Sequence, residues 1–164
     1  MKKLIAVAIM AILPMIAGCG GGGGGSAPQV ALKLSAQGTL PAGKAVAGLG
    51  ATLELPAGVT VKTAAGGVVD PTVVVPSGLL AGAGNATMGP VTYTAATATG
   101  KAKLNFTVAS TAAAGVGVGE YVTITCIFSG VAPTAADFTV LTFDPVDLDG
   151  NPLSLTGSIT VALP

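Results

Sequence analysis

The feature that most constrains this 164-residue chain is an alternation of apolar and polar residues with a period of two. Between Lys101 and Val108, for example, Leu104 and Phe106 fall on one face of an extended chain and their neighbours on the other. Beyond the N-terminal region no sustained apolar period of 3.6 indicates an amphipathic helix. Glycine and proline interrupt the alternating runs every 8–12 residues or so, a spacing typical of an all-β sandwich or barrel.

The alternating runs predict eight or nine strands in one domain that covers residues 29–164. Each strand has a face to bury, so we expect an all-β fold with two packed antiparallel sheets, a β-sandwich. The expected strands are 30–34, 46–55, 59–62, 73–75, 91–94, 101–108, 121–128, 138–143 and 153–163.

The N-terminal residues have the pattern of a secretory signal. A short basic head, Met1–Lys3, precedes the apolar run 4–16, which is shorter than the roughly 20 residues that cross a bilayer. The run ends in Ile16-Ala17-Gly18-Cys19, which resembles the lipobox of bacterial lipoproteins. The resemblance implies removal of the signal peptide 1–18, a diacylglyceryl group on Cys19, and an acyl chain such as palmitate on the new N-terminus. An ordinary cleaved signal and an uncleaved anchor are the alternatives.

A glycine tract follows Cys19 and separates the signal from the domain. Residues 19–28 contain six consecutive glycines and Ser26, a composition that behaves as a flexible tether. Its expected role is to hold the domain away from the lipid surface; the alternative is a tract without selected length. Gly20 stands where an Asp commonly marks inner-membrane retention, so the resemblance implies a lipid-anchored envelope protein at the outer membrane, on either face.

Composition excludes several functions. Without Lys2 and Lys3, five of the seven lysines remain against seven acidic residues, and the chain has no arginine. Nucleic-acid binding needs a concentrated basic face, which five scattered lysines do not provide. The chain also has no histidine and no nucleophile–base pair that can be placed, so we expect no enzyme activity. Cys126 shares the inward face of its strand with Ile124 and Phe128 and is expected to be a buried, inert thiol.

One loop concentrates oxygen ligands that suit calcium, the only cofactor considered. Its candidate ligands are Asp144, Asp147, Asp149 and Asn151. The spacing is not that of an EF-hand, because no acidic residue lies between positions 155 and 164. Asp-Gly and Asn-Pro are turn formers, so the favoured interpretation is a hairpin turn and the alternative is a calcium site.

Four stretches resemble cohesin-like domains. They are residues 48–59, the pair 102–106 and 117–128, residues 133–138, and the Asp/Gly/Asn loop 147–151. The resemblance implies a nine-stranded jelly roll, related in fold to carbohydrate-binding modules, that holds a dockerin partner. The stretch 63–85 departs from the pattern expected of a partner-binding sheet, since it has no aromatic residue and Asp70 is its single charge.

These observations predict an extracytoplasmic lipoprotein whose sandwich binds a protein module or a polysaccharide without catalysis. The sequence does not specify the binding residues. Tyr93 and Tyr121 are candidates to face outward, but two rings fall short of a sugar-stacking platform. The alternative is a structural or assembly component of an envelope complex without a small-ligand or glycan site, and a remote hydrolase is a third hypothesis.

Overall fold

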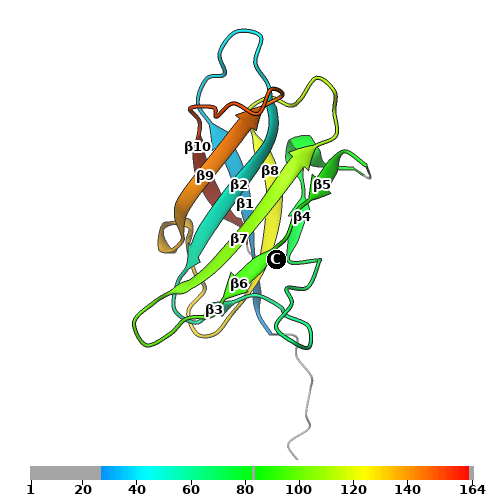
Figure 1. Cartoon of the computed structure of the whole chain (residues 1–164). Coiled ribbons are helices and arrows are strands. Elements are labelled where there is room, and N and C mark those ends of the chain that lie inside the picture. Colours follow the sequence, from blue (N-terminus) through cyan, green and yellow to red (C-terminus); the bar gives the residue numbers. More distant parts are fainter. Residues whose placement is uncertain (1–26, 83, 163–164) are drawn as a thin grey trace, which may run out of the picture.

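The protein is a two-sheet antiparallel β-sandwich (Figure 1). The structure, a computed structural model, describes residues 27–82 and 84–162. Sheet A has the order β10–β1–β8–β3, with β4 also paired to β8; sheet B has the order β5–β7–β2–β9, with β6 also paired to β7. The strands are β1 Gln29–Gln37, β2 Val46–Leu55, β3 Val59–Thr60, β4 Val74–Pro76, β5 Ala86–Met88, β6 Thr92–Thr94, β7 Ala102–Ser110, β8 Glu120–Phe128, β9 Thr139–Asp147 and β10 Thr156–Ala162.

The strand pairings are nested along the chain. The outermost pair is β1 with β10, followed by β2 with β9, then β3 and β4 with β8, and finally β5 and β6 with β7. Two further pairings, β1 with β8 and β2 with β7, join these pairs into the two sheets. A long antiparallel hairpin rolled up in this way is a jelly roll, so the predicted all-β jelly-roll sandwich is confirmed.

The core lies between the sheets and is built from the alternating residues. In β2, Leu49, Ala51 and Leu53 are buried, and they face buried side chains from β1 and β8. Phe106 on β7 is fully buried in the same cluster. Burial of one such large side chain contributes roughly 1.5–3 kcal/mol, so the period-two pattern accounts for both the sheets and their packing.

All nine expected strands are present, with changes at their ends. The structure adds a tenth strand among the described residues, β5, which has only three residues and therefore no recognisable alternation. Strand β9 runs to Asp147 rather than ending at 143, because Pro145 lies on an edge strand that pairs only with β2. An edge strand tolerates proline, since the missing N–H is not needed for a second ladder.

Loops gather at the two ends of the sandwich. The first, which we call the N-terminal pole, is where β1 begins: the Phe128 N–H donates to the Pro28 carbonyl at 3.0 Å, and the Ser129 N–H to the Gly58 carbonyl at 3.0 Å. The opposite pole carries loops 38–45, 111–119 and 148–151 (Figure 1). The expected signal peptide 1–18 and Cys19 lie outside the described residues. No helix in the described ranges is long and apolar enough to span a membrane.

Candidate binding surfaces

The acidic loop at the opposite pole is organised around Asp147. This carboxylate is buried, and its Oδ1 accepts the backbone N–H groups of Asp149 at 2.9 Å and Asn151 at 2.8 Å. Lys44 Nζ lies 2.6 Å from Asp147 Oδ2 and 2.9 Å from Asp149 Oδ2. The hydrogen bond from Lys44, with the backbone donors, lowers the pKa of Asp147 to about 2, and the same contacts raise the pKa of Lys44.

The four candidate calcium ligands do not converge. Asp144 pairs in register with Gly50 on the outer face of sheet B, whereas Asp147 points into the sandwich end. Both oxygens of Asp147 already accept hydrogen bonds, and the ammonium of Lys44 lies between Asp147 and Asp149. Within residues 27–82 and 84–162 no three acidic, cysteine or histidine side chains form a group that could hold a metal. The loop forms a turn in which the Gly150 N–H donates to the Asp147 carbonyl at 3.0 Å, and Lys44 pairs with both loop carboxylates.

Two candidate side chains lie in the core. Cys126 is a free, buried thiol, and burial raises its pKa to about 12. Tyr121 is also buried, which corrects the expectation that it faces outward. Its hydroxyl donates to the Gly117 carbonyl, and burial raises its pKa to about 12. A bulge between Leu34 and Ser35 in the pairing of β1 with β8 shifts the register next to Tyr121, so alternation alone does not give its orientation.

A polar cluster on sheet A resembles a nucleophile with its base. The Ser77 hydroxyl donates to Glu120 Oε1 at 2.6 Å, and Glu120 Oε2 pairs with Lys33 Nζ at 3.0 Å. The hydrogen bond from Ser77, and to a lesser extent the contact with Lys33, lowers the pKa of Glu120. A carboxylate with a lowered pKa is a poor general base for a serine, so the cluster is best explained as a tie between the Ser77 turn and β8.

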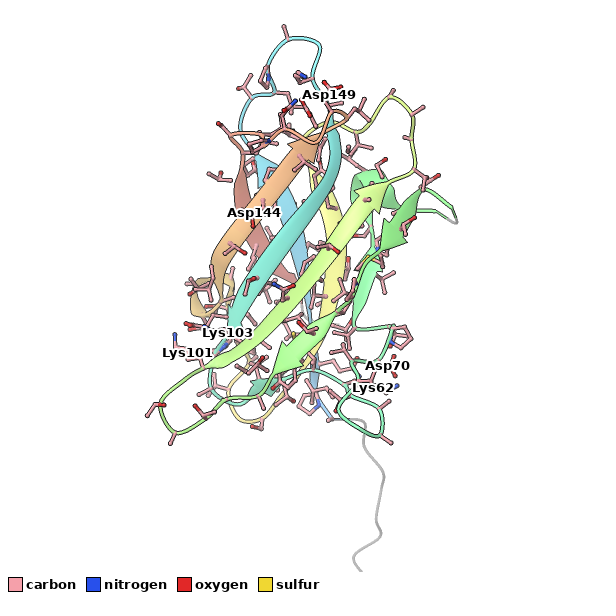
Figure 2. The ribbon with its side chains drawn as sticks, in the orientation of Figure 1. Lys62, Asp70, Lys101, Lys103, Asp144 and Asp149 are labelled. Atoms are coloured by element: carbon pink, nitrogen blue, oxygen red, sulfur yellow. The ribbon has the colours of Figure 1, made fainter. Side chains whose placement is uncertain are left out.

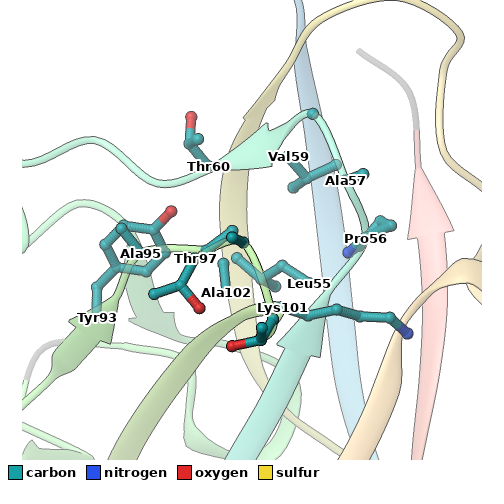
Figure 3. A pocket seen from close by; sticks show the side chains of 15 residues that line it. Leu55, Pro56, Ala57, Val59, Thr60, Tyr93, Ala95, Thr97, Lys101 and Ala102 are labelled. Carbon is teal, nitrogen blue, oxygen red and sulfur yellow. The ribbon is translucent and has the colours of Figure 1, made fainter.

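A pocket of about 490 Å³ opens at the N-terminal pole (Figure 3). It lies between the turn after β2 and the loop that joins β6 to β7. Its walls are mainly apolar, and Tyr93 contributes its one aromatic ring, with Thr97 as a polar neighbour. Lys101 extends away from the pocket and pairs with Glu54 at 2.8 Å. The pocket therefore offers a small apolar volume with few groups to orient a ligand.

A second hollow, which we call the trough, crosses the outer face of sheet B and has a volume of about 380 Å³. Its residues form two rows set by strand register. One row is Val146, Gly48, Ala109 and Thr87, and the next is Asp144, Gly50 and Thr107. The middle of each row is a glycine of β2, so the trough exists because two outward positions of a central strand carry no side chain.

Gly48 and Gly50 differ in how much space the fold leaves for a side chain. A Cβ at Gly48 would lie 3.0 Å from the Val108 carbonyl oxygen and 3.3 Å from Ala109 Cα, so the backbone of β7 leaves it little room. A Cβ at Gly50 would meet only Thr107 Cγ2, at an ordinary 3.6 Å. Gly50 also has no positive φ. Neither packing nor backbone conformation requires glycine at position 50, although glycine weakens a strand interior.

Comparison with protein-family models, with curated proteins and with solved structures finds no match for this chain.

Proposed function

We propose that this protein is a lipid-anchored, extracytoplasmic binding module of the bacterial cell envelope. Its sandwich binds a protein module or a polysaccharide without catalysis. The observation that carries the binding role is the trough, a hollow on a sheet whose other face is densely packed. The glycine at position 50 keeps this hollow open at a cost to strand stability, which is typical of a site that another molecule approaches closely.

The lipid anchor is supported by the sequence from Met1 to Cys19 and by its resemblance to the lipobox. With Cys19 as the attachment point, the ten residues 19–28 reach at most about 35 Å. The described chain starts at the N-terminal pole, beside the turn after β2. In this proposal the pole pocket faces the membrane, and the trough lies on the side of the domain, accessible to a partner.

The anchor is tested by expressing the full gene in a bacterial host with an alkyne-labelled fatty acid. We expect the label on the wild-type protein and its recovery in the outer-membrane fraction. A Cys19→Ala variant removes the acceptor thiol and should lose both. Label-free wild-type protein in the soluble envelope fraction would contradict the anchor and leave the binding role to be tested separately.

The binding role is tested by presenting the purified full-length mature protein to an array of envelope polysaccharides and to envelope extracts. We expect saturable binding to one class of partner, weakened by Gly50→Val, which fills the trough. Fixed-stoichiometry co-purification with an envelope assembly that is insensitive to Gly50→Val would instead favour the structural role and overturn the proposed use of the trough.

A further inference from the structure

We propose that the trough receives a lysine or arginine side chain presented by a partner protein. The aliphatic part of that side chain lies over Gly48 and Gly50, and its cationic end meets Asp144. This inference rests on the proposed binding role and specifies the chemistry of its site.

The charge of Asp144 has no partner among the described residues, unlike that of the other acidic residues. The described ranges contain all seven acidic residues of the chain, and five of them form ion pairs with lysines. A sixth, Asp137, accepts hydrogen bonds from the backbone N–H and the hydroxyl of Thr134. Asp144 alone has neither an ion pair nor a side-chain hydrogen bond with any described residue. Figure 2 places it on β9, in the sheet nearest the viewer. An exposed carboxylate left free at the rim of a hollow is complementary to a cation.

The shape of the trough also suits such a side chain. The hollow is open along the row of Asp144, Gly50 and Thr107, and it is bordered by apolar groups of Val146 and Ala109. Lysine and arginine combine an apolar stem with a charged end, so they suit a surface that is apolar along its floor and negative at one side. The absence of a β2 side chain at position 50 gives the stem direct access to the strand backbone.

The same residues argue against other occupants. No aromatic ring lines the trough, whereas sugar-binding surfaces usually stack rings on the sugar. A divalent cation such as calcium prefers six to eight oxygen ligands, and Asp144 is the single carboxylate here. A cationic side chain needs only one carboxylate and the surrounding apolar surface.

The test uses the full-length mature protein in detergent micelles and nuclear magnetic resonance titration with short peptides. The probes are acetyl-Gly-Arg-Gly-amide, its lysine equivalent, and the citrulline equivalent, which keeps the shape of arginine without its charge. We expect shifts that saturate at Gly48, Gly50, Thr107 and Asp144 with the arginine and lysine peptides. The citrulline peptide should bind at least about tenfold more weakly, because it lacks the charge-assisted contact.

Two variants with matched controls make the test specific. Asp144→Asn should weaken binding about tenfold, whereas Asp149→Asn, which removes an equal charge from the exposed loop, should not. Gly50→Val should abolish binding without loss of stability, and Thr125→Val on sheet A serves as its control. Equal shifts around Asp137 and Asp149, or unchanged binding by Asp144→Asn, would overturn the inference.

An oligosaccharide titration separates failure of this inference from failure of the proposed function. Saturable shifts at the trough with a cello-oligosaccharide, and none with the cationic peptides, would overturn the cationic occupant and keep the binding role. If Asp144→Asn captured a partner on the arrays as strongly as the wild-type protein, the assigned chemistry would likewise be rejected, while the binding role would stand.

Discussion

Asp144 and Asp147 lie three residues apart on β9, and their surroundings are opposite. Asp147 is buried, accepts two backbone N–H groups and pairs with Lys44 at 2.6 Å. Asp144 is exposed beside the trough and has no such partner among the described residues. The odd spacing puts them on different faces of one strand. The strand face therefore separates Asp147, which is tied into the structure, from Asp144, which stays exposed.

The largest expected effect concerns the inner face of sheet B. Phe106→Ala should lower the free energy of unfolding by about 3–5 kcal/mol, because it leaves a cavity in the buried core. The neighbouring outward residue gives the contrast: Asn105→Ala should cost less than about 1 kcal/mol. Urea unfolding of both variants measures the difference. Similar losses from the two would contradict the assignment of inner and outer faces.

Acid unfolding sharpens the comparison of the two carboxylates. Asp147 has a lowered pKa of about 2 in the folded protein, so its stabilising contribution is complete above its usual pKa of 3.8. It is lost as pH falls from about 4 through about 2. Asp147→Asn should therefore lower stability at pH 7 and remove part of the acid sensitivity.

The matched variant is Asp144→Asn, which should leave the urea midpoint at pH 7 unchanged, because Asp144 has no ion pair or side-chain hydrogen bond with a described residue. Urea midpoints at pH 7, 4 and 2 provide the measurement. An Asp144→Asn protein as destabilised as Asp147→Asn would show that Asp144 has a structural partner after all.

Alanine substitutions at the two trough glycines should have smaller effects on stability, in opposite directions. Gly50→Ala should raise the free energy of unfolding by up to about 0.5–1 kcal/mol, because it restricts the unfolded chain and fits in the folded one. Gly48→Ala should lower it, since the new methyl group would press on the backbone of β7. Thermal unfolding of the two variants measures both changes. A destabilised Gly50→Ala would give position 50 a packing reason and weaken the case for the trough.

Calcium is expected to have the smallest effect. With Lys44 between Asp147 and Asp149, added calcium should leave the melting temperature unchanged. A one-site ligand at 100 times its dissociation constant would add about 2.7 kcal/mol to the stability, so a real site would be visible. A saturable rise in melting temperature, lost in Asp149→Asn, would restore the calcium hypothesis.

The core could be predicted because burial follows alternation directly. Leu104 and Phe106 are expected on one face of their strand, and both are fully buried. The separation of Asp144 from Asp147 was not predicted, because the expected strand ended at 143 and left both residues outside it. Once β9 is known to continue along an edge, alternation alone places the two carboxylates on opposite faces.

The trough is beyond the reach of a single sequence. Alternation with Thr52 and Glu54 puts Gly50 on the outer face, and that signal was present. The hollow itself depends on which residues of β7 and β9 stand beside Gly50, namely Thr107 and Asp144. Those neighbours are more than 50 positions away in the chain, and local patterns carry no information about such register.

The nested pairing of the strands has a consequence for how the molecule is made. Strand β1 is flanked by β8 and β10, so both of its neighbours come from the C-terminal third of the chain. Contacts so distant in sequence form slowly, because a long loop must close before they stabilise anything. Strand β1 stays without its second neighbour until β10 has been synthesised, so sheet A is complete only after that strand has emerged.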